Sequence, residues 1–335
     1  MWITADLELI SPISMSNQST ISEFILMGFP GLQQKYYIPV SITMFLVYCV
    51  SLVANSSVII LVLQKEQLHQ PMYIIIRNLA LSDLLFDTIT LPKIIAKYWF
   101  GAGSITFYGC FFQLFCVNSL GSLYSFIIML MAIDRYVAIC QPLRYHSIIS
   151  NKLVTLLCYF LWVFAALIGS IVAVIVGQLP YCGPNRVKNC FCVNSAVAVL
   201  ACVDVTLARR TVFILAMCVL LLPLAVIILS YVLIIRVIHS TNTENSWKAF
   251  YTCSTHLMVI GLYFIPRVFV YSTSQIPLTL DADINVLLLC LYTFIPHLAS
   301  PIIFCLRTKE IRNILGQIIT TIFHIDSEHG SRTLQ

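Results

Sequence analysis

Charge is scarce in this sequence. Asp, Glu, Lys and Arg make up 10% of the 335 residues, whereas hydrophobic residues make up 59%, and the mean hydropathy is +0.92. A soluble domain usually carries about 25% charged residues. A chain this apolar cannot cover its surface with polar groups, so we expect lipid to surround it. The formal net charge is only +5 and no basic block occurs, which argues against nucleic acid as a partner.

Motifs for catalysis and metal binding are missing as well. No HExxH or GxSxG pattern occurs, and the histidines are scattered along the chain. The sequence therefore predicts neither an enzyme nor a protein with a metal site or cofactor. Many transporters show internal repeats with matching helix breaks, and none is found here. A transporter or channel is thus the less favoured alternative.

Long apolar runs are abundant. A helix needs about 20 apolar residues to span a bilayer, and seven stretches qualify. They cover approximately 37–63, 72–97, 107–139, 153–177, 209–238, 248–273 and 284–305. We therefore predict an all-α membrane protein with a seven-transmembrane helix bundle at 37–305. Residues 1–36 would be extracellular and residues 306–335 cytoplasmic, with a short amphipathic helix 8 at about 307–319 on the inner leaflet.

The N-terminal residues show no apolar core of a cleavable signal peptide, so we expect the first span to direct membrane insertion. Asn17 begins an Asn-Gln-Ser triplet, which is a glycosylation acceptor if this end is lumenal. The excess of Lys and Arg on the inner side is small but has the sign expected for that orientation.

Cysteines support the same orientation. Cys182, Cys192 and Cys202 stand ten residues apart between the fourth and fifth spans, and Cys110 begins the third span. Four cysteines in one compartment indicate two disulfides, which form in an oxidising environment. Cys190 is a fifth cysteine in this region and could compete with Cys192 for a partner.

Several motifs occur in register with these spans. They are PMYIIIRNLALSD from Pro71, MAIDRYVAICQPLRY from Met131, LPYCGPN from Leu179, KAFYTCSTH from Lys248 and PIIFCLRTKEIR from Pro301. Together they resemble the odorant receptors, which are rhodopsin-like (class A) G protein-coupled receptors, over roughly residues 15–316. The stretch that starts at Met15 resembles the usual beginning of these receptors, so residues 1–14 are expected to be an extension or to follow from an upstream start. The loop cysteines and LPYCGPN look most like the fish-like branch, whose ligands tend to be water-soluble.

The resemblance implies an activation switch at the cytoplasmic end of the third helix. Asp134 would pair with Arg135 at rest, and activation would turn Arg135 toward Tyr231 as the sixth helix swings outward. Tyr136, Asn55, Asp83 and Pro301 complete the expected switch residues. Without the other motifs, an interfacial ion pair at a helix end would be the better explanation of Asp134 and Arg135.

The chain departs from the family in the seventh helix. Ser300 and Phe304 stand where the family has Asn and Tyr, so the usual activation relay is altered. Asp83 matches a carboxylate that often binds sodium in class A receptors, but Tyr124 and Ser300 replace its usual helpers. We therefore expect no strong sodium site, and a hydrogen bond from Asn55 or water is the alternative role for Asp83.

The resemblance also implies two disulfides and a ligand pocket. The disulfides are Cys110–Cys192 and Cys182–Cys202. The family binds small molecules between the third, fifth and sixth helices, under the loop that follows the fourth helix. The expected lining residues are Val117, Asn118, Gly121, Ser122, Ser195, Phe264, Arg267, Val268 and Tyr271.

Arg267 is the unusual member of this set, because a guanidinium in an apolar helix needs a partner. It would anchor an anionic ligand, since Arg binds carboxylates bidentately. The structural alternative is an internal pair with Asp87, Asp204, Asp281 or Asp283, or hydrogen bonds to carbonyls that Pro266 leaves free.

These patterns predict an odorant receptor of the plasma membrane. It would bind small, water-soluble or acidic organic molecules and activate a stimulatory, olfactory-type heterotrimeric G protein. The other partner is membrane lipid, and the second candidate is a non-olfactory class A receptor.

Overall fold

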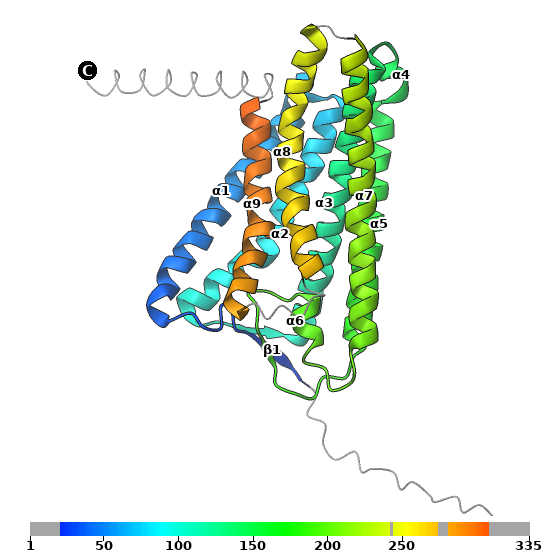
Figure 1. Ribbon diagram of the computed structural model, residues 1–335. Helices are drawn as coiled ribbons and strands as arrows, with labels where there is room; N and C mark the ends of the chain where they lie inside the picture. Colours follow the sequence, from blue (N-terminus) through cyan, green and yellow to red (C-terminus); the bar gives the residue numbers. More distant parts are fainter. Residues whose placement is uncertain (1–20, 242–243, 274–280, 308–335) are drawn as a thin grey trace, which may run out of the picture.

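The computed structural model describes residues 21–241, 244–273 and 281–307, and Figure 1 shows that they form an elongated bundle of helices. Each predicted transmembrane stretch overlaps one long helix. The long helices are α1 (Tyr37–Gln64), α2 (Pro71–Phe100), α3 (Phe107–Cys140), α5 (Asn151–Gly177), α7 (Thr206–Thr241), α8 (Glu244–Thr273) and α9 (Ala282–Arg307). The predicted fold class, an all-α seven-helix bundle, is confirmed.

The long helices are long enough to cross a bilayer. At 1.5 Å per residue a helix needs about 20 residues to cross the hydrocarbon. Within the described residues, α1, α3, α5, α7 and α9 are also apolar enough to do so on composition alone. The described apolar part of α8 is shorter, His256–Ser272. Inside α2, Arg77, Asp83 and Asp87 lower the hydropathy, and both carboxylates are buried inside the bundle.

Local sequence sets several helix ends. Pro71 opens α2, where its missing N–H costs no hydrogen bond, and Gly101 ends the helix with φ of 69°. The side chain of Thr106 caps α3 by accepting from the Gly109 amide, and Ser150 caps α5 by accepting from the Leu153 amide.

A three-stranded sheet closes one end of the bundle, which we call the sheet end. Its strands are β1 (Glu23–Leu26), β2 (Ser104–Thr106) and β3 (Arg186–Val187). β1 lies in the middle, antiparallel to β2 and parallel to β3. These strands were not predicted from the sequence, because each has only two to four residues and its partner is distant in the chain. They join the segment before α1 to the loops that precede α3 and α7.

Short helices lie in the connections. They are the 3-10 helices η1 (Gln34–Tyr36), η2 (Glu66–Leu68) and η3 (Pro142–Arg144), and the α-helical turns α4 (Tyr145–Ile148) and α6 (Asn194–Ala198). Figure 1 shows α4 at the end of the bundle opposite the sheet, whereas α6 lies at the sheet end.

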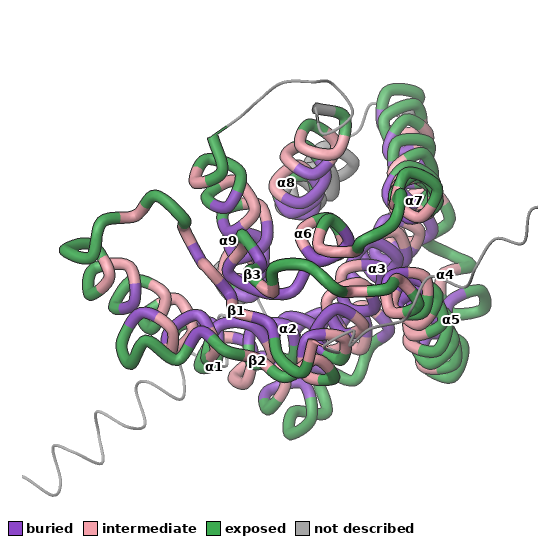
Figure 2. Tube along the Cα trace, turned by 90° about the horizontal axis from the view of Figure 1, so that it is seen from below, coloured by how far each residue is buried: buried purple, intermediate pink, exposed green. Residues whose placement is uncertain are grey.

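The core runs along α2 and α3. Leu79, Tyr124 and Phe264 are among its fully or almost fully buried side chains. A second cluster beneath the sheet includes Phe24 from β1, Leu114 from α3 and Val187 from β3. Buried residues face the inside of the bundle, and Figure 2 shows exposed residues on the outward faces of α1, α5 and α7. Many of these exposed side chains are large and apolar, as expected of a surface in lipid.

Candidate ligand-binding cavity

A cavity of about 860 Å³ lies at the sheet end of the bundle. Its walls come from α3, α5, α7, α8 and α9, and the loop between α5 and α7 contributes Arg186, Asn189 and Ser195 among others. Pockets for small organic ligands span about 300–1,000 Å³. The cavity is therefore large enough for a small organic molecule.

Seven of the nine predicted lining residues border this cavity. They are Val117, Asn118, Gly121, Ser122, Ser195, Arg267 and Tyr271. Phe264 and Val268 do not border it. Along α8 the cavity is instead lined by Tyr263, Arg267, Val270 and Tyr271. This spacing places them on one face of the helix. The predicted face differs by about one residue, because it included Phe264 in place of Tyr263.

The fifth helix, α7, borders the cavity as expected, but no residue of α7 or α9 was among the predicted lining residues. Residues of α7 and α9 at the cavity include Leu215, Val219, Asn285, Leu289, Tyr292 and Thr293. The three-to-four-residue spacing from Asn285 to Tyr292 was a usable signal for one helical face. The prediction did not include the seventh helix, because the pocket was expected between the third, fifth and sixth helices.

The cavity lining carries positive charge only. Arg186 and Lys188 come from the loop and Arg267 from α8, and no Asp or Glu is among the described lining residues. Amide and hydroxyl groups, such as those of Asn118, Ser122 and Tyr271, add hydrogen-bonding capacity. The electrostatics of this cavity therefore favour an anion over a cation.

Arg267 is buried, with 7% of its surface exposed. Its Nη1 donates to the Tyr292 carbonyl on α9 at 2.9 Å and to the Tyr263 carbonyl at 3.5 Å. Its guanidinium lies over the Tyr263 ring, 3.8 Å from the ring centroid. The Tyr292 carbonyl is available because Pro296, four residues later, has no amide hydrogen to bond to it.

The four carboxylates named as structural alternatives all have other hydrogen-bond partners. Asp87 bonds His297 and Ser51, and Asp204 accepts from Thr206. Asp281 accepts from the Asp283 amide, and Asp283 accepts from the Gly31 amide. Among the described residues, no carboxylate lies within ion-pair distance of Arg267. The other structural alternative, hydrogen bonds from Arg267 to free backbone carbonyls, is observed. The free carbonyl, however, is that of Tyr292, which Pro296 leaves without a partner, and is not one freed by Pro266.

Two disulfides hold the loop over the cavity. Cys110 at the start of α3 bonds Cys192, with Cα atoms 5.5 Å apart, and Cys182 bonds Cys202, with Cα atoms 5.9 Å apart. The Cys192 amide also donates to Gln113 Oε1 at 2.8 Å. Cys190 is a free, buried thiol. The loop is thus tied to α3 beside Ser195.

Hydrogen bonding in the same loop acts on the pKa of an exposed carboxyl. Asp204 accepts hydrogen bonds from the Thr206 side chain and amide, which lower its pKa. Asp204 therefore stays a carboxylate at the start of α7.

The Asp134–Arg135 pair lies near the opposite end of α3. Arg135 Nε is 4.0 Å from Asp134 Oδ2, and Asp134 also accepts from the Tyr145 hydroxyl at 2.7 Å. Burial raises the pKa of Tyr145, with the Asp134 charge acting in the same direction. Tyr145 therefore stays a hydroxyl donor at neutral pH. Tyr231 on α7 is buried, and Tyr136 packs partly buried against the core.

Of the other predicted switch residues, Asn55 on α1 and Asp83 on α2 are fully buried. The Asn55 amide nitrogen donates to Ser51 rather than to Asp83, so the hydrogen bond considered between Asn55 and Asp83 does not form. Ser300 bonds the Tyr124 hydroxyl at 2.7 Å. Tyr124 and Ser300, which replace the usual helpers of Asp83, are therefore partners of each other. Pro301 is buried inside α9. Asn17 and residues 308–319 of the predicted helix 8 lie outside the described residues.

Comparison with known proteins decides the family. The profile of the olfactory receptor family matches residues 44–322. Human olfactory receptor 2M2 is 35% identical over 313 residues, which cover 92% of this chain and 88% of the relative. Human olfactory receptor 56A1 is 35% identical over 315 residues, which cover 93% and 99%. Mouse olfactory receptor 56B34 is 37% identical over 302 residues, which cover 89% and 92%.

The chain belongs to the olfactory receptor family. As an olfactory receptor it is a multi-pass membrane protein and a G protein-coupled receptor, not an enzyme. In this olfactory receptor, the cavity, the disulfides and the paired Asp134 and Arg135 lie on one bundle, and α3 contributes to all three.

Proposed function

We propose that this olfactory receptor binds small, water-soluble organic anions in the cavity and activates a stimulatory, olfactory-type G protein. The proposed ligand class is supported by the surroundings of Arg267, which borders the cavity. Among the described residues, Arg267 donates its hydrogen bonds to backbone carbonyls and not to a carboxylate. A carboxylate ligand would provide the bidentate partner that Arg267 lacks. The fish-like branch, indicated by the loop cysteines and LPYCGPN, agrees with water-soluble ligands.

The hydrogen bond from Arg267 to Tyr292 suggests how binding is transmitted. It joins α8 to α9 at the cavity. A ligand carboxylate would compete with the Tyr292 carbonyl for the guanidinium, so the contact between α8 and α9 would change when an acid binds. At the cytoplasmic end, Arg135 would leave Asp134 and turn toward Tyr231 as α8 swings outward, which opens the site for the G protein.

The remaining switch residues have supporting roles in this proposal. Tyr136 would pack at the interface with the G protein. Asn55, Asp83 and Pro301 would set how α1, α2 and α9 rearrange between the two states. The outward swing of α8 is thus biased by the ligand at one end and by the G protein at the other.

The proposal predicts that Arg267→Ala weakens acidic agonists selectively. A charge-assisted hydrogen bond contributes about 1.5–3 kcal/mol, so the half-maximal concentration should rise about tenfold to a hundredfold. Arg267→Lys should restore only part of the response, because a point charge cannot reproduce the planar fork. The measurement is a cyclic-AMP dose-response curve normalised to surface expression, with each acid compared with its methyl ester.

The esters and one matched variant serve as controls. Esters should be weak on the wild type and almost unaffected by Arg267→Ala. Arg210→Ala removes an exposed guanidinium from α7 that is outside the cavity lining, and it should leave acid potency unchanged. An equal loss for acids and esters after Arg267→Ala would show that Arg267 is structural and that the anion-binding proposal is wrong.

A further inference from the structure

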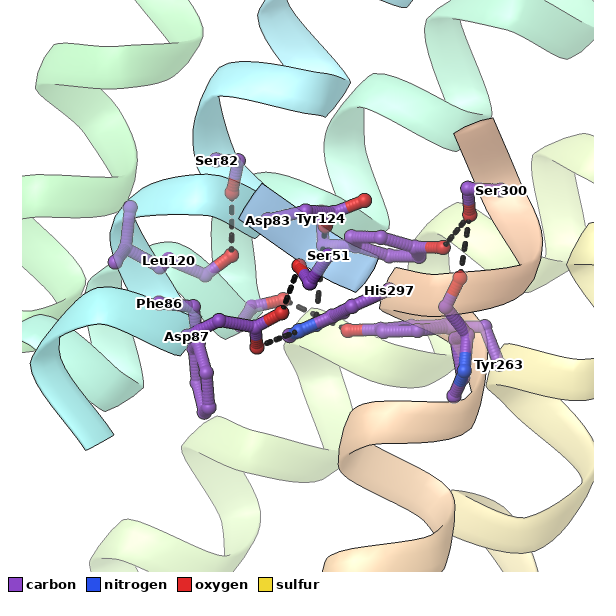
Figure 3. Close-up of polar contacts among 12 residues, drawn as sticks. Ser51, Ser82, Asp83, Phe86, Asp87, Leu120, Tyr124, Tyr263, His297 and Ser300 are labelled. Atoms are coloured by element: carbon purple, nitrogen blue, oxygen red, sulfur yellow. Dashed lines mark hydrogen bonds and ion pairs between the residues drawn. The ribbon is translucent and has the colours of Figure 1, made fainter. Parts of the chain in front are cut away.

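Three ionisable side chains meet between α2 and α9, as Figure 3 shows. Asp83 and Asp87 lie one turn apart on α2, and His297 reaches them from α9. His297 Nδ1 is 2.8 Å from Asp87 Oδ1, and Nε2 is 3.8 Å from Asp83 Oδ1. The imidazole therefore stands between the two carboxylates.

The cluster is closed to solvent. Asp83 and Asp87 are fully buried, and His297 has only 3% of its surface exposed. Ser51 on α1 donates to Asp87, and Asn55 donates in turn to Ser51. Neither oxygen of Asp83 has a hydrogen-bond partner among the described residues. A buried carboxylate without such a partner is costly, so Asp83 requires a compensating positive charge or a proton.

Charge counting shows that His297 alone cannot supply that compensation. Two carboxylates with a neutral imidazole give a net charge of about −2, and protonation of the imidazole leaves about −1. The groups that face the cluster from other helices do not change this. α1 offers Ser51 and Asn55, and α3 offers Tyr124, all of them neutral.

α8 contributes two groups near the cluster, Tyr263 and Arg267. Arg267 is the only cation close to Asp83 among the described residues. Tyr263 bonds Ser125 and the Gly121 carbonyl, and Arg267 is already bound to the Tyr292 carbonyl. Neither forms a hydrogen bond or ion pair with Asp83. The cluster is therefore short of one positive charge.

We propose that the Asp83–Asp87–His297 cluster is a buried proton-binding site that holds one proton on the imidazole and one on Asp83. The imidazolium then donates to Asp87 and faces Asp83, and the cluster is neutral. It clamps α9 to α2 while Asp134 and Arg135 are paired. This inference does not depend on which ligand the cavity binds, because it concerns a different group of residues.

The geometry favours protons over a metal ion. The imidazole occupies the space between the two carboxylates, and the Phe86 and Tyr124 rings pack beside it at centroid distances of 4.9 and 5.6 Å. Within the described residues, no group of three or more His, Cys, Asp or Glu side chains is arranged to hold a metal ion. His297 thus supplies the positive charge that a bound cation would otherwise bring.

The proposal fixes the sign of a pH dependence. Near neutral pH the folded receptor would hold more protons than the unfolded chain, in which Asp83 is ionised and His297 is largely neutral. Stability must then fall as the pH rises, because the folded state loses the protons that the unfolded chain never held. Proton release from the cluster would weaken the link between α2 and α9, because a neutral imidazole keeps at most the hydrogen bond to Asp87 and loses its positive charge.

The first experiment detects the protons in the wild-type receptor, purified in lipid nanodiscs without an agonist. Infrared spectroscopy should show a protonated-carboxyl band that Asp83→Asn removes and that Asp204→Asn, the exposed loop control, leaves in place. Nitrogen NMR of labelled histidines should show one imidazolium at neutral pH that His297→Gln removes. Absence of both signals from the wild type would overturn the proposal, and this measurement does not require any variant to fold.

The second experiment follows thermal unfolding from about pH 5 to pH 8, where histidine titrates. Each pH is measured in sodium buffer and in N-methylglucamine buffer. The midpoint should fall as the pH rises, equally in both buffers, and Asp83→Asn should flatten the profile while Asp204→Asn should not. A midpoint that depends on sodium and not on pH would show that the site binds a metal ion and that the proton assignment is wrong. Neither experiment uses ligand or G protein, so failure here is distinct from failure of the proposed function.

Discussion

At the scale of single residues, Arg135 is informative. It lies near the end of α3 that is remote from the cavity. Its Nε lies 4.0 Å from Asp134 and has no hydrogen-bond partner among the described residues. Asp134 also accepts from Tyr145, so in the proposed switch it would stay anchored when Arg135 leaves. The arginine would then be the mobile member of the pair, and Asp134 the fixed one.

We expect Arg135→Ala to abolish G protein activation while ligand binding is largely retained, because the cavity does not include Arg135. The measurements are nucleotide exchange on a stimulatory G protein and surface expression in the same cells. Tyr145→Phe is the matched test of the anchor, since it removes one hydrogen bond worth about 1–2 kcal/mol and should alter basal activity only modestly. Normal signalling by Arg135→Ala at normal surface levels would disprove the switch.

Arg267 shows what the sequence can and cannot predict about a residue. A lone arginine in an apolar helix indicates a special role, and the choice between ligand and internal carboxylate stayed open. The structure shows that the internal partner is the Tyr292 carbonyl, which Pro296 leaves free. That contact joins residues 25 positions apart on two helices. No local pattern encodes it, so only the packed bundle shows it.

At the scale of elements, the seven helices follow directly from apolar runs longer than the bilayer requires. The sheet does not follow from any such local pattern, because the hydrogen bonds of β1 with β2 and β3 depend on how the loops meet at the sheet end. The expected face of α8 differed by one residue from the observed face. Its exposed side, which includes Met258, Ile265 and Phe269, is as apolar as its buried side, so the hydrophobic pattern gives little directional information.

The disulfides set the position of the loop, and the two should differ in importance. Cys110–Cys192 joins residues 82 positions apart and ties α3 to the loop, whereas Cys182–Cys202 closes only 20 positions. In the chain-entropy account, a longer closed loop gains more, and removing a native disulfide costs about 2–5 kcal/mol in small secreted domains. We expect Cys110→Ser with Cys192→Ser to reduce surface expression more than Cys182→Ser with Cys202→Ser.

Flow cytometry of intact cells measures that difference, and non-reducing peptide mapping of the wild type tests the pairing itself. The paired replacements leave no unpaired thiol to form a wrong bond. Recovery of a peptide that joins Cys110 to Cys190 would contradict the assignment, because Cys190 is a free thiol in the structure.

At the scale of the whole molecule, the cavity and the switch are joined by the helices that they share. α3 carries both Asn118 at the cavity and Arg135 near the other end, and α8 carries Arg267. A ligand can bias the G protein site only if it binds the two states with different affinities. In the proposed function, the Arg267–Tyr292 hydrogen bond would give such a difference, because an acid would compete with it and a neutral molecule would not.

The receptor as a whole should therefore discriminate by charge in a cyclic-AMP assay. In cells that carry an olfactory-type stimulatory G protein, short organic acids should raise cyclic AMP, whereas amines of the same length should not. Arg186, Lys188 and Arg267 would repel an ammonium group, and no described lining carboxylate would receive it. Acids should produce no ion flux in proteoliposomes that contain the receptor, which separates signalling from transport. Activation by amines with no response to any acid would exclude the organic-anion ligand class, while the family assignment, which depends on 279 matched residues from 44 to 322, would stand.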